Sequence, residues 1–252
     1  MNEKLEVPLE AAARLLRQAN RIVCLTGAGV SAESGVATFR AGTDTQSDAL
    51  WSRFDPQQLA SQEGFAANPG MVWQWYMHRL MAVESAKPND GHRALAQLEH
   101  NVPSFTVVTQ NVDDLHERGG SRRVLHLHGR INRFRCNLCG FEHELLPAEK
   151  RAARPPRCLS CDGAVRPDVV WFGEPLPAVP FDRATRLAQT AEVFVVVGTS
   201  GLVEPAASLV RLARRWGAAV IVIDPHASAS TCEATHWLEG SAADVLTALL
   251  RA

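Results

Sequence analysis

The stretch GAGVSAESGVATFR, residues 27–40, decides the fold and the chemistry expected of this chain. The apolar run 22–26 just before it is typical of a buried strand. Gly27, Gly29 and Ala32 fit the G-x-G-x-x-G/A spacing of a dinucleotide-binding turn, where the backbone can approach a pyrophosphate because no Cβ is in the way. A dehydrogenase would continue into a long helix and then a strand that ends in an acid about 20 residues on. Here Gly35 ends any helix early, and no such strand follows. We therefore expect a dinucleotide that is held by the turn and covered by the loop beyond it.

The rest of the chain alternates short apolar runs with amphipathic segments. This alternation predicts an α/β fold, a Rossmann-like, doubly wound and mainly parallel sheet. Expected strands are 22–26, 105–109, 124–127, 193–197 and 219–223, and expected helices are 8–20, 71–84, 91–99, 181–190, 205–216 and 242–250. We predict a single domain, 1–252, with a helical segment at 41–90 that includes the loop beyond the glycine turn and a polar, cysteine-bearing insert at 132–167. Residues 168–173 are expected to return to the main core.

Charge and composition exclude some partners. The chain has 26 basic and 27 acidic residues and a formal net charge of −1, which gives no reason to expect nucleic acid or a membrane surface. It has no apolar run of the about 18 residues that a membrane span needs. Its first residues lack the apolar core of a signal peptide, so we expect a cytoplasmic protein with reduced thiols.

Four of the six cysteines form a metal-ligand pattern. Cys136 and Cys139 make one C-x2-C knuckle, and Cys158 and Cys161 make a second. Two such knuckles can place four thiolates tetrahedrally around Zn²⁺. Because sulfur fills all four positions, the predicted zinc is structural and not catalytic.

Polar residues or glycines follow five of the expected strands. They stand at 26–27, 109–111, 128–129, 198–200 and 224. In an open α/β sheet the ligand binds at the carboxyl edge of the strands, so these residues are expected to meet there. Asn111 and Asp113 could hold an amide and hydroxyl groups, although a helix cap is an equally good interpretation from the sequence alone. We expect only one of His126 and His128 to face the site, and Gly129 favours His128, whose neutral ring could act as a base.

Several motifs, taken in order, resemble the signatures of the sirtuins, the NAD-dependent protein deacylases. Residues 27–40 are similar to the first signature, TQNVDDLHERGG at 109–120 to the second, and LHG at 127–129, followed by Cys136, to the third. Gly198-Thr199-Ser200 with Val203 and Pro205 matches the fourth. The similarity runs from about 21 to 243. Ala37, Gly119 and Asp224 stand where the family usually has Pro, Ala and Asn.

The resemblance implies NAD as the cofactor, a structural zinc and acylated lysine side chains of proteins as partners. The lysine acyl oxygen would attack the ribose anomeric carbon and release nicotinamide. His128 would then act as general base on a ribose hydroxyl, and the products would be free lysine and O-acyl-ADP-ribose. The implied catalytic residues are His128, Asn111 and Asp113. The implied cofactor-binding residues are Gly27, Ala28, Gly29, Glu33, Thr38, Phe39, Arg40, Gln110, Asn111, Asp113, Gly198, Thr199, Ser200, Asp224 and Ala242.

One pair of residues bears on the acyl group. Tyr76 and Arg79 lie three residues apart on an otherwise apolar helical segment and could clamp a carboxylate, although Arg79 could instead snorkel to water from a core helix. The pair resembles the sirtuin branch that removes succinyl and malonyl groups. The implied substrate-binding residues are Tyr76, Arg79, Val169, Val170, Phe172 and Gly173.

Three other functions remain open at this point. A plain NAD-dependent protein deacetylase is one. A mono-ADP-ribosyltransferase would use the same NAD pocket, but this function gives Tyr76 and Arg79 no role. A non-catalytic NAD-sensing module is a third possibility, although a sensor has no need of a base such as His128.

Overall fold

The computed structural model describes residues 3–36 and 56–252, and its centre is a parallel sheet of six strands. The strands are β1 Arg21–Thr26, β2 Ser104–Thr109, β3 Val124–His126, β7 Val193–Val197, β8 Ala219–Ile223 and β9 His236–Leu238. Their order across the sheet is β3-β2-β1-β7-β8-β9, and every neighbouring pair is parallel. Strand β1 thus lies at the centre. Strands β2 and β3 extend the sheet on one side of it, and β7, β8 and β9 extend it on the other. This is the doubly wound order of dinucleotide-binding folds, as the sequence predicts.

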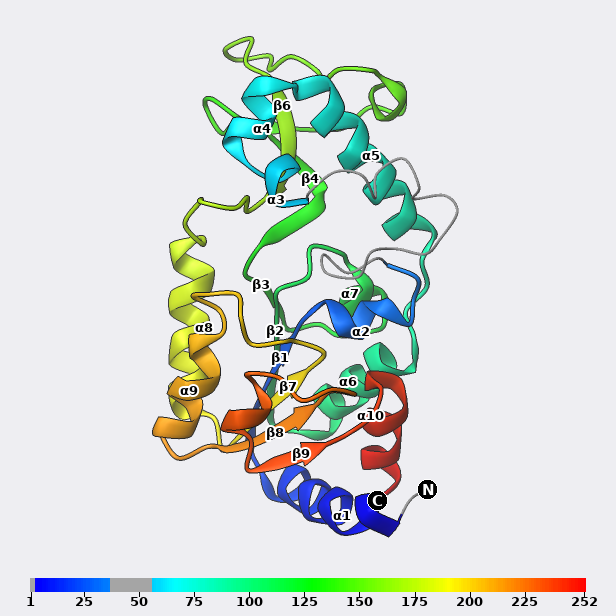
Figure 1. The fold of residues 1–252 in the computed structure, drawn as a ribbon, viewed down its shortest axis with the longest axis vertical. Helices are drawn as coiled ribbons and strands as arrows, with labels where there is room; N and C mark the ends of the chain where they lie inside the picture. The colour runs from blue at the N-terminus through cyan, green and yellow to red at the C-terminus, as the bar shows by residue number, and fades with distance from the viewer. Residues whose placement is uncertain (1–2, 37–55) are drawn as a thin grey trace.

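Helices cover both faces of this sheet (Figure 1). One face packs against α1 Glu3–Gln18, α6 Asp90–Asn101 and α10 Ala242–Arg251, and the other against α8 Ala178–Thr190 and α9 Ser208–Arg215. In β1, Ile22 and Cys24 belong to the first of these cores, and Val23 and Leu25 to the second. A strand that is buried on both faces needs apolar residues at every position, which explains the unbroken apolar runs in the sequence.

A second, smaller unit packs beyond one end of the sheet (Figure 1). Its antiparallel sheet has the order β5-β4-β6 and consists of β4 Gly129–Cys136, β5 Glu142–His143 and β6 Val165–Val169. Helices α3 Pro56–Leu59, α4 Gln62–Ala67 and α5 Pro69–Ser85 supply much of its core. That core is rich in aromatic residues, among them Trp73, Trp75 and Trp171. We call this unit, residues 56–85 and 129–174, the small module.

The structure differs from the sequence-based expectation in three places. Residues 168–173 do not rejoin the main sheet, because β6 pairs with β4 and Trp171 is buried in the small module. Strand β9 was not predicted, since its three residues are too few to show an apolar period. Helix α1 begins at Glu3, ahead of Pro8, and α9 begins only at Ser208. No helix in the described part of the chain is long and apolar enough to cross a membrane.

Candidate active site

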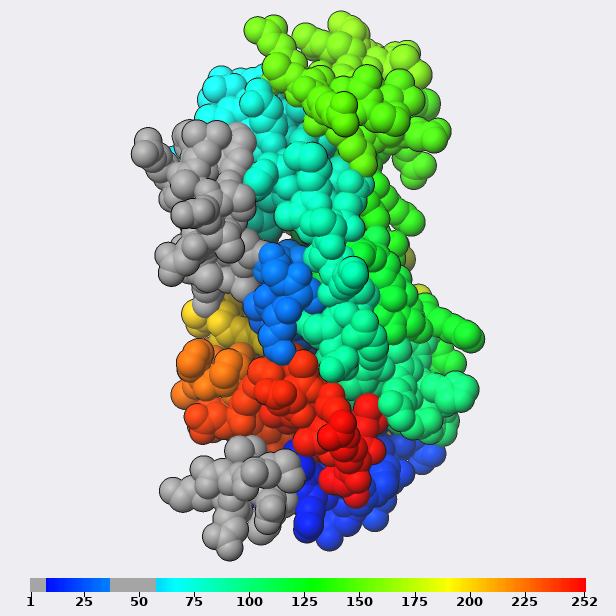
Figure 2. Space-filling view, turned by 90° about the vertical axis from the view of Figure 1, so that its right-hand side faces the viewer, coloured from blue at the N-terminus to red at the C-terminus, as the bar shows by residue number. Residues whose placement is uncertain are grey.

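The glycine turn lies between β1 and β7, where the strand order reverses. Gly27 N donates to Val197 O at 3.0 Å, and Gly29 N donates to Gly198 O at 2.9 Å. A Cβ on Gly29 would stand 2.7 Å from Gly198 Cα, which is closer than atoms can approach. The glycine at this position is therefore required by packing of the two strand ends. The short helix α2, Ala28–Ala32, follows, and Gly35 ends that segment with a φ of 80°. In the space-filling view α2 is flanked by the α5–α6 segment and by α10 (Figure 2).

A cavity of about 780 Å³ opens at this edge of the sheet, in the size range of small-molecule sites. The structure brings to it all of the described residues that the sequence assigned to catalysis, cofactor or substrate. From the cofactor set these are Gly27, Ala28, Gly29, Glu33, Gln110, Asn111, Asp113, Gly198, Thr199, Ser200, Asp224 and Ala242. His128 and the substrate set Tyr76, Arg79, Val169, Val170, Phe172 and Gly173 complete the lining. Thr38, Phe39 and Arg40 fall outside the described residues.

Asn111 and Asp113 are held at the end of β2 by a residue that the sequence reasoning missed. Ser31 Oγ donates to Asp113 Oδ2 at 2.9 Å and accepts from Asn111 Nδ2 at 3.1 Å. Asn111 Nδ2 also donates to Gly27 O at 3.1 Å. Burial raises the pKa of Asp113, while hydrogen bonds from Leu115 N and Ser31 oppose this shift. Ser31 is buried beside both residues. In the sequence, the only sign of this role is the position of Ser31 within the stretch 27–40.

Other contacts join the neighbouring strand ends. Gln110 Nε2 donates to Thr199 Oγ1 at 2.9 Å, which ties the end of β2 to the turn after β7. Asp224 follows β8, and its Oδ1 accepts from His226 N at 2.9 Å. Glu33 Oε1 accepts from Ala243 N at 3.4 Å, next to Ala242 at the start of α10. The polar strand ends therefore converge on one edge, as predicted.

The two histidines near the end of β3 have different partners. His128 Nδ1 lies 2.8 Å from Gln110 O, which can only accept, so Nδ1 carries the proton and Nε2 keeps a lone pair. Burial lowers the pKa of His128, and the hydrogen bond to Gln110 O partly offsets this shift. His126 is engaged with Glu117 Oε1 at 2.8 Å and Asn111 O at 3.2 Å. Of the two, only His128 lines the cavity.

Tyr76 and Arg79 line the end of the cavity that borders the small module. Tyr76 is 2% exposed, and its hydroxyl accepts a hydrogen bond from Trp171 Nε1 at 2.8 Å. The Arg79 guanidinium carbon stands 5.1 Å from the centre of the Trp75 ring. Burial raises the pKa of Tyr76, and the positive charge of Arg79 opposes this shift. The phenol is therefore neutral at physiological pH and the guanidinium is charged.

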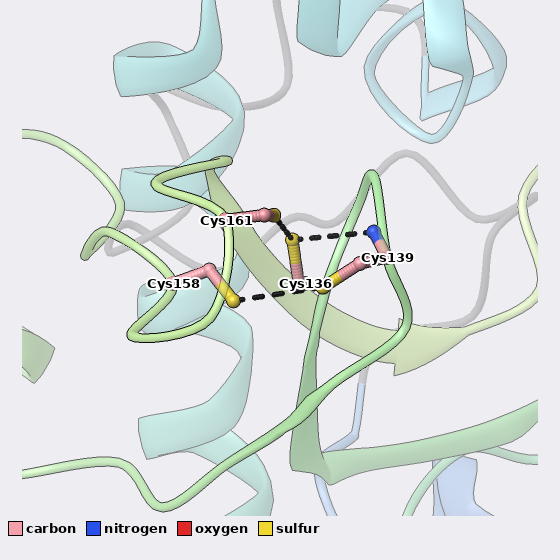
Figure 3. Close-up of side chains that lie close together, drawn as sticks. All are labelled: Cys136, Cys139, Cys158 and Cys161. Carbon is pink, nitrogen blue, oxygen red and sulfur yellow. Dashed lines mark hydrogen bonds between the residues drawn. The ribbon is translucent and has the colours of Figure 1, made fainter.

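The four cysteines of the small module converge on one point (Figure 3). Cys136 Sγ lies 3.4 Å from Cys161 Sγ, Cys139 Sγ lies 3.7 Å from Cys158 Sγ, and all four sulfurs are within 4.8 Å of one another. Tetrahedral Zn–S bonds of about 2.3 Å require sulfurs about 3.8 Å apart, so the cluster fits zinc. With four sulfur ligands and no open position, the metal is structural.

Comparison with known proteins agrees with this geometry. Residues 27–205 match the model of the Sir2 family, and the chain belongs to that family. NAD-dependent protein deacylase 1 of Pseudomonas aeruginosa is 45% identical over 249 residues, which cover 96% of this chain and 98% of that protein. The NAD-dependent protein deacylase of Aeropyrum pernix is 49% identical over 213 residues, 84% of each chain.

Solved structures give the same result. A crystal structure of a Sir2 homologue with NAD matches with a TM-score of 0.88 and 44% identity, over 96% of this chain and 92% of that chain. A complex of Sir2 with a p53 peptide and NAD⁺ matches with a TM-score of 0.85 and 27% identity, over 96% and 97% of the two chains.

Proposed function

We propose that this Sir2-family chain removes succinyl and malonyl groups from protein lysines, and acetyl groups more weakly. The broader activity rests on its relatives: like them, the chain is an NAD-dependent protein deacylase. The observation that carries the finer proposal is that Tyr76 and Arg79 line the same cavity as Asn111, Asp113 and His128. A carboxylate on the acyl chain would meet a charged guanidinium there, at the far end of the site from the glycine turn.

NAD would occupy the cavity along the carboxyl ends of β1, β2 and β7. The pyrophosphate would lie against the glycine turn, where Gly27 and Gly29 leave room for close approach. Asn111 and Asp113 are fixed by Ser31, so they need no rearrangement to hold the nicotinamide ribose. Asp224 lines the cavity at the end of β8 and would accept from an adenosine ribose hydroxyl.

His128 would act as the general base. Its Nδ1–H is committed to Gln110 O, so Nε2 remains as the proton acceptor. Because burial lowers the pKa of His128, the ring is neutral at pH 7 and ready to accept a proton. In the proposed sequence, nicotinamide leaves when the acyl oxygen attacks the ribose, and His128 then takes the proton of a ribose hydroxyl. The buried, largely apolar walls of the cavity would keep water from the cationic ribose centre.

The acyl end of the cavity is apolar apart from a few groups. Ile131, Val169 and Val112 line its sides and suit the methylene groups of an acyl-lysine. Arg79 offers planar paired donors to a carboxylate, and the Tyr76 hydroxyl offers one more. The structure of a Sir2 protein with a bound p53 peptide supports a protein substrate.

The test compares matched acetyl-, succinyl- and malonyl-lysine peptides with NAD in the wild type and in Arg79→Met, by mass spectrometry. We expect the wild type to favour the two acidic acyl groups. We expect the variant to lose at least tenfold in kcat/KM for succinyl-lysine, since a hydrogen-bonded charge pair is worth about 1.5–3 kcal/mol. If Arg79→Met keeps the wild-type ratio of succinyl to acetyl turnover, the carboxylate clamp is wrong.

A further inference from the structure

The hydroxyl of Tyr76 is oriented by a neighbour on a different element. Trp171 Nε1 donates to Tyr76 Oη at 2.8 Å, and both side chains are at most 2% exposed. An indole N–H can only donate, so the direction of this bond is fixed. The phenol oxygen is the acceptor, and its own hydrogen stays available for another partner. Among the described residues, no acceptor for that hydrogen is found, and Tyr76 borders the cavity.

Trp171 is itself held by a buried ion pair. The Arg166 guanidinium carbon lies 3.2 Å from the centre of the Trp171 ring, and Arg166 is fully buried. Arg166 donates to both carboxylate oxygens of Glu174, at 2.6 and 2.9 Å, and Trp171 N donates to the same carboxylate at 2.9 Å. Burial acts against ionisation of Glu174, yet the Arg166 hydrogen bonds keep the pKa of Glu174 below its usual value. Glu174 is thus a paired charge and would not repel an acidic acyl group.

The same network reaches the metal knuckle. Asn137, the residue after Cys136, accepts at Oδ1 from Arg166 Nη1 at 3.2 Å and from Gln62 Nε2 at 3.1 Å. Gln62 Nε2 also donates to Glu174 at 2.7 Å. A continuous set of hydrogen bonds and ring contacts therefore joins the cysteine cluster to the Tyr76 hydroxyl. A bound zinc that fixes the knuckle would also fix Trp171.

We propose that Trp171 is a specificity-determining positioning residue. By occupying the oxygen of Tyr76, its indole N–H makes the phenol a donor toward the cavity, where an acyl carboxylate would accept. This inference rests on the proposed preference for acidic acyl groups. It adds that the preference depends on Trp171, and through it on the buried Arg166–Glu174 pair, and not on Tyr76 and Arg79 alone.

The test is a double-mutant cycle of Tyr76→Phe and Trp171→Phe, read as the ratio of succinyl to acetyl kcat/KM. Phenylalanine at 171 keeps an aromatic ring for Arg166 to stack on but removes the N–H. We expect Trp171→Phe to lower the ratio about fivefold, the effect of one hydrogen bond, and Tyr76→Phe to lower it about tenfold. In the Tyr76→Phe background, Trp171→Phe should lower the ratio less than twofold, because the two residues act through one hydroxyl.

Trp73→Phe is the matched control. Trp73 is a buried tryptophan of the same core that donates to Glu149 O at 3.2 Å, so its replacement costs a similar indole hydrogen bond that does not involve the Tyr76 hydroxyl. This variant should keep the wild-type ratio. A Trp171→Phe protein that folds and keeps the wild-type ratio, while Tyr76→Phe lowers it, overturns the inference and leaves the proposed function intact. Absence of any succinyl preference in the wild type, with no effect of Tyr76→Phe, overturns both.

A second measurement does not depend on the folding of Trp171→Phe. Tyr76 is the only tyrosine in the chain, so protein labelled with ¹³Cζ-tyrosine gives a single ring resonance. We expect a succinyl-lysine peptide, but not its acetyl counterpart, to shift this resonance, because only the former accepts from the hydroxyl. Equal shifts with both peptides would overturn the inference.

Discussion

The two units of the molecule bury their cores by different means. The parallel sheet is covered by helices on both faces and depends on apolar residues such as Ile22, Val23 and Val195. The small module has a three-stranded sheet, a fully buried arginine and a four-cysteine cluster at its tip. The parallel sheet is held by apolar burial, whereas the small module adds a buried ion pair and a metal site to its aromatic core. The cavity lies between them, so the ends of the parallel strands form one wall and the small module forms the other.

Removal of the metal is expected to separate the two units most clearly. Cys158→Ser or a strong chelator should unfold the small module, since structural zinc contributes on the order of 10 kcal/mol or more to small metal domains. Trp73, Trp75 and Trp171 are buried in that module, so near-ultraviolet circular dichroism should lose most of its signal while the far-ultraviolet signal of the parallel sheet persists. Cys232→Ser, which removes an exposed thiol outside the cluster, is the control. Full activity with an unchanged melting curve in metal-free protein would contradict this division.

A smaller effect is expected from substitutions in the glycine turn of the parallel-sheet unit. Gly29→Ala places a Cβ 2.7 Å from Gly198 Cα and must push the turn away from β7, at about 1–3 kcal/mol in the free energy of unfolding and at least tenfold in NAD affinity. Gly35→Ala meets no atom within 4 Å, but its φ of 80° is unfavourable for alanine, at about 1 kcal/mol. Urea unfolding and NAD titration of both variants measure the difference. Equal NAD affinities in the two variants would show that the turn is not the cofactor wall.

A third effect concerns the pH dependence of the parallel-sheet unit. Burial lowers the pKa of His116 to about 3 and that of His92 to about 4, and their rings lie 4.9 Å apart. Below pH 6.5 both histidines become protonated in the unfolded chain. In the folded protein His92 stays neutral down to about pH 4 and His116 down to about pH 3. The free energy of unfolding should therefore fall as pH decreases from 6.5, by about 1.4 kcal/mol per unit for each histidine.

Substitution of one histidine isolates this contribution. His116→Gln should reduce the slope of stability against pH between 6.5 and 5 by about 1.4 kcal/mol per unit, measured by urea unfolding at a series of pH values. His100→Gln, at an exposed position near the end of α6, serves as the control. An unchanged slope in His116→Gln would mean that His116 is protonated in the native state.

The sequence predicts the parallel sheet and the metal site better than it predicts strand β9 and the sheet of the small module. Apolar runs such as 193–197 are strands because both faces are buried, and this leaves a clear mark in the sequence. The cysteine spacing marks the metal site equally well. Strand β9 leaves no such mark, and the residues of β6 pair with residues of β4 that lie 29 to 40 positions away along the chain.

The sequence also does not reveal the hydrogen bonds that orient the side chains lining the cavity. Ser31 bridges Asn111 and Asp113, which lie 80 and 82 residues away from it, and Trp171 bonds a tyrosine 95 residues away. Spacing rules describe residues within one element, so they reveal Tyr76 and Arg79 as a pair but not the tryptophan that orients the hydroxyl. Such contacts exist only once segments far apart in the sequence are packed against each other within each unit.

The central claim is that one cavity performs two separable tasks, cleavage of NAD at Asn111 and Asp113 and acyl transfer with His128 as base. It is tested most directly by His128→Ala with NAD and a succinyl-lysine peptide, with both exchange of labelled nicotinamide and formation of O-acyl-ADP-ribose measured. We predict normal NAD binding and continued nicotinamide exchange, with product formation reduced at least a hundredfold, as expected when a general base is lost. Product formation at the wild-type rate in this variant would contradict the account.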